Sequence, residues 1–297
     1  MGKPPVADLR TRRDSRRDPR KAPDRENSVH PQHSGSGILR PSSTGDESRV
    51  TTTATTEKSP ARLTLAWSVH LLTASGAVIG MLSIVEILAG DLNHAALLIM
   101  LALGIDSIDG TLARKAHVSQ LLPDVDGRRL DDIVDFLNFV IVPVVFMVAS
   151  GHLASWIWAI APVLASAYGF SQAEAKTEDE FFRGWPSYWN VVALYAWLLD
   201  ISVLSGTLWT LGLSVAIFVP LKYVYPSRVR VLRRTTNALG IIWGLMIVMA
   251  IMFPMWSRSW SIAEISLLYP IYYTALSFWL GGLRDRARQF RDTRAGP

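Results

Sequence analysis

Four aspartates are spaced so that two consecutive helices could direct them at one point. Asp106 and Asp109 are three residues apart, and Asp131 and Asp135 are four residues apart. Residues at these spacings share one face of an α-helix, so we expect each pair on one face of its own helix. Carboxylate oxygens suit hard cations such as Mg²⁺ and Mn²⁺. Two such ions can polarise a phosphoryl group, and the pattern therefore predicts a metal site for phosphoryl-group chemistry.

Small residues and one cation accompany the aspartates. Gly110 and Ala113 share the face of the first pair, and Gly127 shares the face of the second. They leave room for a bulky ligand or for the close approach of two helices. Arg114 could hold a phosphate, or it could anchor its helix at the membrane surface. Asp131 could also act as a helix N-cap, and the residues alone leave these alternatives open.

The elements that must position the aspartates are membrane helices. The apolar residues occur in long runs with few charges, which is typical of transmembrane segments. Eight helical segments are predicted, at 63–89, 95–113, 131–150, 152–172, 187–204, 207–224, 237–256 and 260–283. The expected fold is an all-α polytopic membrane protein with about eight transmembrane helices. The chain contains no Cys, which excludes disulfides and Cys-based zinc sites.

The distribution of cations predicts an orientation. Arg114, Lys115, Arg128 and Arg129 lie in the connection after the second segment, and the connections after the fourth and sixth segments are also basic. The positive-inside rule places these connections and both termini in the cytoplasm. Asp106 would then lie about 12 Å below the cytoplasmic end of its helix. An ionisable residue at that depth is costly and indicates a functional site.

The net charge of +5 belongs to one end of the chain. Residues 1–62 carry 13 Lys and Arg against 8 Asp and Glu, and the remainder is neutral. A basic tail of this kind does not indicate a nucleic-acid partner. Its composition, rich in Arg, Pro, Ser and Thr, is typical of disorder. We therefore expect a disordered basic tail at 1–61, a membrane domain at 62–285 and a cytoplasmic C-terminal tail at 286–297.

The aspartate pattern resembles the signature of the CDP-alcohol phosphotransferase family. That signature reads Asp, two residues, Asp-Gly, two residues, Ala-Arg, a spacer, Gly, three residues, Asp, three residues, Asp. Every fixed position is present, as Asp106, Asp109, Gly110, Ala113, Arg114, Gly127, Asp131 and Asp135. The resemblance covers roughly residues 62–285.

The spacer departs from the usual family pattern. It runs for 12 residues, from Lys115 to Asp126, and is longer than in most members. This length resembles a bacterial branch of the family that uses choline as its alcohol. The segments 130–136, 186–192 and 223–228 are similar to that branch too, as is the large number of predicted spans.

The resemblance implies a specific reaction. The donor would be CDP-diacylglycerol, the acceptor would be free choline, and the products would be phosphatidylcholine and CMP. Two Mn²⁺ or Mg²⁺ ions would be held by Asp106, Asp109, Asp131 and Asp135. The CDP site would be lined by Gly110, Ala113, Arg114 and Gly127. Asp135 would be the candidate base for the choline hydroxyl.

The resemblance also implies a cellular location and an oligomeric state. It predicts a multi-pass protein of the bacterial cytoplasmic (inner) membrane whose active site faces the cytoplasm. A homodimer is a further expectation, because members of the family commonly pair.

Two aromatic residues are candidates for choline binding. A quaternary ammonium binds against aromatic faces. Tyr188 and Trp189 lie at the predicted cytoplasmic start of the fifth segment, on the same side of the membrane as the aspartates. From the sequence alone, an aromatic belt at the membrane interface is the simpler explanation of the same residues.

Two other functions remain as alternatives. The first keeps the reaction and changes the alcohol to serine, inositol or glycerol phosphate, for which Arg128 and Arg129 offer basic groups. The second is a transporter with an acidic ion site, which predicts ionisable residues along several spans. The acids here gather at one end of two helices, which favours an enzyme.

Overall fold

The computed structural model describes residues 59–172, 181–224 and 232–282. The chain divides into two units, Met1–Thr53 and Ala54–Pro297, and every described residue belongs to the second. The predicted C-terminal tail lies outside the described residues, as does the predicted N-terminal tail up to residue 58. Lys176, Arg228 and Arg230, which contribute to the predicted orientation, also lie outside them.

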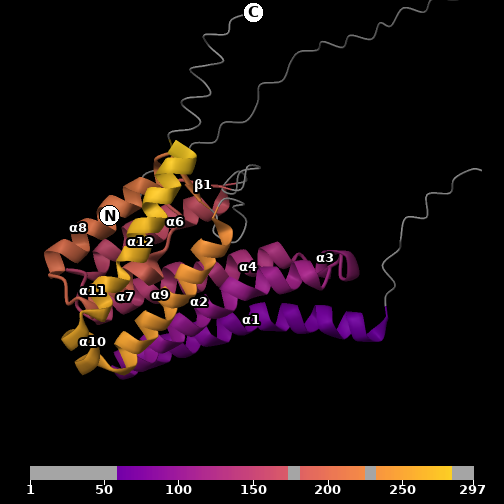
Figure 1. Cartoon of the computed structure of the whole chain (residues 1–297), viewed down its shortest axis with the longest axis horizontal. Coiled ribbons are helices and arrows are strands. Elements are labelled where there is room, and N and C mark those ends of the chain that lie inside the picture. The colour runs from indigo at the N-terminus through magenta and orange to yellow at the C-terminus, as the bar shows by residue number, and fades with distance from the viewer. Residues whose placement is uncertain (1–58, 173–180, 225–231, 283–297) are drawn as a thin grey trace, which may run out of the picture. The chain divides into compact units, whose positions relative to one another are not determined.

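Helices make up most of the described chain (Figure 1). They are α1 (Pro60–Ala89), α2 (Leu92–Lys115), α3 (Val118–Leu121), α4 (Gly127–Asp135), α5 (Val142–Ala149), α6 (Ile160–Ser171), α7 (Trp189–Leu198), α8 (Val203–Phe218), α9 (Arg233–Met252), α10 (Pro254–Trp260), α11 (Ile262–Ser266) and α12 (Leu268–Ser277). The 3₁₀ helix η2 (Trp156–Ala159) and the π-helical turns η1 (Phe136–Ile141) and η3 (Phe278–Gly282) extend them. The two strands are β1 (Phe181–Arg183) and β2 (Lys222–Val224).

Four helical segments are long and apolar enough to cross a membrane. They are Pro60–Ala89, Leu92–Lys115, Gly127–Ala149 and Arg233–Met252. Three shorter apolar segments cover Trp156–Ser171, Trp189–Leu198 and Val203–Phe218. The prediction of a helical membrane protein is confirmed at this level. Each of the eight predicted segments contains helix. The helix predicted at 207–224 is wrong at its end, because α8 stops at Phe218 and Lys222–Val224 forms the strand β2. In addition, α7 has only 10 residues, about 15 Å of helix against a hydrocarbon core of about 30 Å.

Two predicted helices are interrupted for local reasons. The segment predicted at 187–204 ends at Leu198, because Asp200 adopts a left-handed backbone conformation with φ +48°. Ser202 then begins α8, its side chain accepting a hydrogen bond from the backbone N–H of Ser205 at 3.2 Å. The segment predicted at 260–283 is divided among the end of α10, α11, α12 and η3, with Ser261 at φ +49° between α10 and α11.

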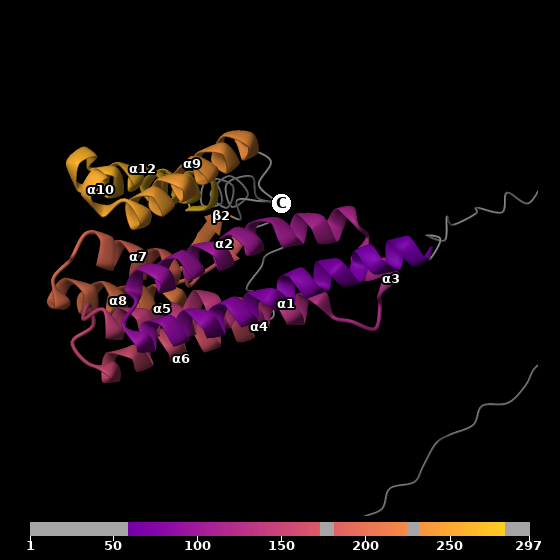
Figure 2. The same ribbon diagram turned by 90° about the horizontal axis from the view of Figure 1, so that it is seen from below.

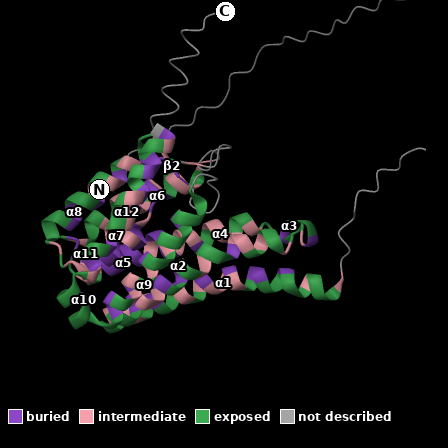
Figure 3. Cartoon of the chain, in the orientation of Figure 1, coloured by how far each residue is buried: buried purple, intermediate pink, exposed green. Residues whose placement is uncertain are grey.

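The outer faces of the helices carry large apolar side chains. Leu71, Leu88, Leu204 and Met255 are 71%, 79%, 68% and 75% exposed. Figure 3 shows exposed positions along the outer faces of α1, α8 and α10. Apolar surface on this scale marks contact with lipid or with another protein. It agrees with the membrane assignment made from helix length.

The first two helices form a hairpin that frames the aspartates. Gly90, with φ +82°, ends α1 in a left-handed cap, and α2 begins two residues later (Figure 2). α4 packs against α1, so α2 and α4 lie beside the same helix. On the other side of α2, α9 contributes Trp243, Ile247 and Ile251 to the main apolar core.

The predicted long spacer is partly helical. α3 forms within it, and Val118 and Leu121 are buried against Ala66 and Val69 of α1. This contact holds the connection between α2 and α4 along the end of α1. The spacer therefore has a defined path between the two aspartate-bearing helices.

A π-helical turn follows Asp135. The backbone N–H of Val142 donates to the carbonyl of Leu137, five residues back. The side-chain amide of Asn138 donates to the carbonyl of Gly76 on α1 at 2.9 Å and to that of Val134 at 3.1 Å. π-helical turns often occur at functional sites. This one joins the segment that carries two aspartates to the buried helix α5.

A small β-ribbon adds to the predicted all-α fold. β1 pairs antiparallel with β2, and Phe181 lies opposite Val224. The ribbon joins the segment before α7 to the segment after α8. It stays close to α12, because Tyr273 donates a hydrogen bond from its hydroxyl to the carbonyl of Val224 at 2.8 Å.

Candidate metal and substrate site

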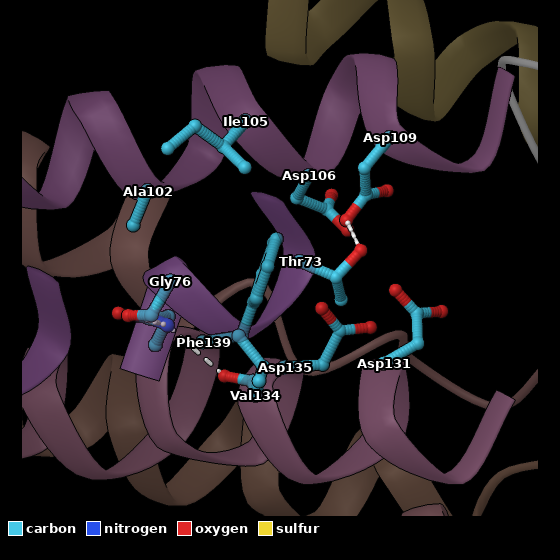
Figure 4. A pocket seen from close by; sticks show the side chains of 11 residues that line it. Thr73, Gly76, Ala102, Ile105, Asp106, Asp109, Asp131, Val134, Asp135 and Phe139 are labelled. Carbon is cyan, nitrogen blue, oxygen red and sulfur yellow. Dashed lines mark hydrogen bonds between the residues drawn. The ribbon is translucent and has the colours of Figure 1, made fainter. Parts of the chain in front are cut away.

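Three of the four predicted aspartates converge. Asp106 of α2 and Asp131 and Asp135 of α4 each present a carboxylate oxygen within 4.8 Å of the others (Figure 4). Oxygen ligands lie about 2.0–2.6 Å from Mg²⁺ or Ca²⁺, so two oxygens on one ion are separated by at most about 5 Å. The spacing and the all-oxygen donor set both fit a hard divalent cation. The three residues that the helix spacing groups on two faces thus lie close together.

Asp109 lines the same cavity and has a partner on α1. Its carboxylate accepts a hydrogen bond from the hydroxyl of Thr73 at 2.8 Å, and its side chain is 4% exposed. Thr73 was not predicted from the sequence. A threonine in an apolar helix carries no signal by itself, because its role depends on which helix packs against it. Figure 4 shows this bond beside the other three carboxylates.

The cavity between the carboxylates has apolar walls. Ala102 and Ile105 of α2 line it, together with Val134 and Phe139, and its volume is about 10 Å³, enough for one water-sized group. Carboxylates held together in such a place repel one another and are poorly solvated. A bound cation removes both costs. The arrangement can therefore hold a divalent cation.

Gly110 and Arg114 lie at the open end of α2. A side chain added at Gly110 would meet only the guanidinium of Arg114, at 3.4 Å. Arg114 is exposed and donates a hydrogen bond to the hydroxyl of Thr111 at 3.0 Å. These two positions retain space next to the aspartates, as a substrate-lining role requires.

Gly127 and Ala113 are both packed against neighbouring side chains. A Cβ atom at Gly127 would lie 2.8 Å from Cε1 of His70 on α1, so this glycine permits a close helix contact. Ala113 packs against the apolar cluster of Ala66, Val69 and α3. The packing role that the sequence left open is therefore present at both positions.

The two predicted choline residues lie in different surroundings. Trp189 is fully buried, and its indole N–H donates to the hydroxyl of Ser166 at 2.8 Å. Tyr188 is half-buried, with its ring 6.2 Å from that of Phe139 and 5.9 Å from that of Tyr273. Phe139 lines the aspartate cavity. The rings of Phe139, Tyr188 and Tyr273 thus form an aromatic cluster, and Phe139 is its member at the cavity.

Phe139 also was not predicted as a site residue, although a signal was available. It follows Asp135 by four residues, and the helix rule that groups the aspartates places it on a nearby face. Tyr273 carries no such signal, because it comes from α12, more than 130 residues farther along the chain.

Comparison with known proteins identifies the family. Residues 68–220, just over half of the chain, match the model of the CDP-alcohol phosphatidyltransferase family. A phosphatidylcholine synthase of Borreliella burgdorferi is 35% identical over 226 residues, covering 73% of this chain and 95% of the relative. A phosphatidylcholine synthase of Legionella pneumophila is 39% identical, covering 72% and 88%. One of Pseudomonas aeruginosa is 30% identical, covering 73% and 89%. The chain therefore belongs to the CDP-alcohol phosphatidyltransferase family.

Proposed function

We propose that this protein is a phosphatidylcholine synthase. It transfers the phosphatidyl group from CDP-diacylglycerol to choline and releases CMP. The observation that carries the proposal is the convergence of Asp106, Asp131 and Asp135 in a member of this family. The acceptor is assigned from the relatives, which are named for the synthesis of phosphatidylcholine.

The reaction is a displacement at the phosphorus that carries diacylglycerol. The choline hydroxyl forms the new P–O bond, the bond to CMP breaks, and CMP leaves with the electron pair. Asp135 accepts the hydroxyl proton as general base. Two Mn²⁺ or Mg²⁺ ions, held by Asp106, Asp109, Asp131 and Asp135, would supply charge stabilisation for the attacking and leaving oxygens.

The remaining motif residues hold the donor. The guanidinium of Arg114 pairs with a phosphate oxygen at the mouth of the site. Gly110 leaves space beside it, and Ala113 and Gly127 allow α1, α2 and α4 to approach closely around the nucleotide. Thr73 fixes the orientation of Asp109 through the hydrogen bond between them.

Choline binds beside Phe139 and Tyr188. Phe139 shares the cavity with Asp135, and Tyr188 contacts Phe139. Aromatic faces attract a quaternary ammonium without requiring a hydrogen bond from it. Trp189 is buried next to Tyr188 and packs edge-on against Trp185, with the two ring centroids 4.6 Å apart. Its role is to support the aromatic site that Tyr188 presents.

The topology of the proposal follows from the charges. The chain crosses the bacterial inner membrane about eight times, both termini are cytoplasmic, and the aspartate site faces the cytoplasm. The cations of the connection between α2 and α4 lie at that end of the site and favour this orientation. The membrane domain covers residues 62–285, between the basic N-terminal tail and a short C-terminal tail. Two copies pair as a homodimer, which crosslinking in native membranes tests.

The activity is tested in membranes that lack phosphatidylcholine. The protein receives CDP-diacylglycerol, labelled choline and Mn²⁺, and labelled phosphatidylcholine and CMP are measured. Metal-dependent product that disappears with Asp135→Ala supports the proposal. Release of CMP only with another alcohol would change the assigned acceptor and leave the assignment of the site intact. No CMP release with any alcohol, from folded protein, overturns the enzymatic function.

A further inference from the structure

The aromatic cluster beside the aspartate cavity extends to α12. Phe139 of η1 lines the cavity, Tyr188 contacts Phe139, and Tyr273 of α12 contacts Tyr188. The rings of Tyr188 and Tyr273 meet in a T-shaped arrangement, with their planes 65° apart. Tyr273 is 9% exposed, whereas Tyr188 is half-buried. Tyr273 is therefore the buried end of the cluster, and its contact restricts the plane of the Tyr188 ring.

Tyr273 is fixed in place by its contacts with β2. Its hydroxyl donates a hydrogen bond to the carbonyl of Val224 at 2.8 Å. The backbone N–H of Val224 donates to the hydroxyl of Ser277 at 3.1 Å, and that hydroxyl donates to the carbonyl of Tyr273 at 2.8 Å. All three residues are buried. Both backbone groups of Val224 thus bond to one turn of α12, which leaves the Tyr273 ring little freedom to move.

The β-ribbon connects the same turn of α12 to the segment that carries Tyr188. β2 pairs with β1, where Phe181 lies opposite Val224. Directly after β1, the backbone N–H of Gly184 donates to the carbonyl of Leu221 at 2.8 Å, and Tyr188 follows four residues later. α12 therefore acts on Tyr188 in two ways, directly through the ring of Tyr273 and indirectly through the ribbon.

β2 and α12 lie outside residues 68–220, the range that matches the family model. The four aspartates, Phe139 and Tyr188 all lie inside that range. The contact between Tyr188 and Tyr273 is therefore not explained by the residues that assign the chain to its family. It connects a residue from outside the matched range to the cavity through two intervening rings.

An aromatic cluster distinguishes ammonium groups by their need for hydrogen bonds. The quaternary nitrogen of choline carries no N–H and binds against aromatic faces. The primary ammonium of ethanolamine has the same charge but resembles the head group of Lys, which is strongly hydrated and donates hydrogen bonds. Aromatic faces replace few of those hydrogen bonds. The orientation of the rings therefore affects the binding of a quaternary group more than that of a primary one.

We propose that Tyr273 is a positioning residue that makes the acceptor site selective for a quaternary ammonium. It holds the ring of Tyr188 in the orientation in which this ring, beside Phe139, contacts the methyl groups of the acceptor. Tyr273 itself touches neither substrate. The inference rests on the proposed function for the identity of the acceptor. It adds a determinant of selectivity from α12.

The test separates the ammonium site from the rest of the reaction. Tetramethylammonium carries the quaternary group without the hydroxyl, so its inhibition constant (Ki) against choline reports on the ammonium site alone. Ethanolamine is the matched inhibitor with a primary amine. Tyr273→Leu should raise the KM of choline and the Ki of tetramethylammonium in parallel, about 2- to 10-fold, the value of one aromatic pair. The kcat, the KM of CDP-diacylglycerol and the Ki of ethanolamine should stay within about twofold of wild type.

Tyr273→Phe and Tyr195→Phe form a matched pair of variants. Each removes the hydroxyl of a buried tyrosine, and that of Tyr195 lies 2.7 Å from the hydroxyl of Ser266 in α11. Tyr195 also accepts a hydrogen bond from Trp243 in the main apolar core. Tyr273→Phe retains the ring and should raise the Ki of tetramethylammonium less than Tyr273→Leu does. Tyr195→Phe should leave that constant unchanged. If Tyr273→Leu does not fold, the comparison of the two Phe variants decides.

Four outcomes overturn the inference. The first is an unchanged Ki of tetramethylammonium in folded Tyr273→Leu, or in Tyr273→Phe if the Leu variant does not fold. The second is an equal rise in the KM of CDP-diacylglycerol, and the third is an equal rise in the Ki of ethanolamine. The fourth is a rise in the Ki of tetramethylammonium in Tyr195→Phe as large as that in Tyr273→Phe.

The proposed function can fail separately, so the binding of tetramethylammonium to the full-length protein is also measured by calorimetry with CMP and Mn²⁺. Weaker binding in Tyr273→Leu, together with wild-type protein that makes no phosphatidylcholine, would support the ammonium site and contradict choline as the acceptor. Synthesis of phosphatidylcholine with the same constants in wild type and every variant would support the function and contradict the inference.

Discussion

The α1–α2 hairpin and its neighbours carry two groups of potential metal ligands, one near each end. At the turn, Glu86, Asp91 and His94 present ligand atoms within 4.8 Å of one another. At the other end, Asp106, Asp131 and Asp135 meet the same criterion. The two groups differ in how deeply they are buried and in how far apart along the chain their members lie. Proximity of ligand atoms is therefore a weak indicator by itself.

The residues at the turn are close together in the sequence, and two of them contact each other. Asp91 caps α2, accepting from the backbone N–H of His94 at 3.0 Å, and its second oxygen lies 2.7 Å from Nδ1 of the same residue. The side chains of His94 and Asp91 are 69% and 42% exposed. These contacts explain the cluster as a helix cap. The aspartate site instead joins residues from α2 and α4, is partly buried and opens on a cavity.

The largest expected difference between the two groups is in catalysis. Asp135→Asn should lower the rate of CMP release by roughly 10²- to 10⁴-fold, because it removes a general base and a ligand. Glu86→Gln, the matched change at the turn, should remain within about twofold of wild type. Rates at saturating Mn²⁺ measure both. Equal losses in the two variants would contradict the distinction drawn between the groups.

Thr73→Val tests whether the aspartate site depends on its support from α1. The variant removes a hydrogen bond to a buried carboxylate, a contact worth roughly 1.5–3 kcal/mol, so Mn²⁺ affinity should change and activity should fall about tenfold or more. Thr73→Ser should restore both. Thr64→Val is the control, since the hydroxyl of Thr64 donates a hydrogen bond within its own helix, to the carbonyl of Pro60. Wild-type metal affinity and rate in Thr73→Val would remove Asp109 from the site.

Tyr188→Leu sharpens the assignment of the acceptor. Loss of an aromatic face next to a quaternary ammonium should raise the KM of choline about 2- to 30-fold, with the KM of CDP-diacylglycerol unchanged. Tyr188→Phe should behave like wild type, because the ring face is retained. Steady-state rates with each substrate varied give the answer. A parallel rise in both constants would indicate a general packing defect in place of a choline site.

The smallest effect concerns pH and the group at the turn. The hydrogen bond from the backbone N–H of His94 holds the pKa of Asp91 below its ordinary value of 3.8. The ionised form is favoured in the folded protein, so its stabilising contribution is complete above about pH 3.8 and is lost as the pH falls through the lower folded pKa. The Tm difference between wild type and Asp91→Ala should therefore be larger at pH 5 than at pH 3. A Tm difference that grows as the pH falls would contradict a lowered pKa of Asp91 in the folded protein.

The aspartate site was predictable because its signal is local. Spacings of three and four residues assign a common face without knowledge of tertiary structure, and Asp106, Asp131 and Asp135 do lie close together. The contacts of Thr73 with Asp109 and of His70 with Gly127 could not be assigned in this way. They depend on the rotation and register of α1 against α2 and α4, which an apolar sequence does not specify.

The limits of the predicted fold have similar causes. The apolar runs predict helix at every one of the eight segments, but the end of α7 depends on the backbone conformation at Asp200, for which the sequence gives a weak signal. The β-ribbon pairs two strands of three residues each, about 40 residues apart. Pairings so short and so distant have no periodic pattern to reveal them.

The π-helical turn after Asp135 determines where the chain can change in length. One residue corresponds to about 100° of helical rotation, so a single deletion within Phe136–Ile141 would turn α5 relative to α4. Asp131 and Asp135 would leave their cavity, or Phe146 and Met147 would leave the core. Residues 122–126, between α3 and α4, are different, because a loop outside the helices can absorb an added residue without turning either helix. Variation in chain length among working versions of this protein should therefore be more common in this loop than in the turn.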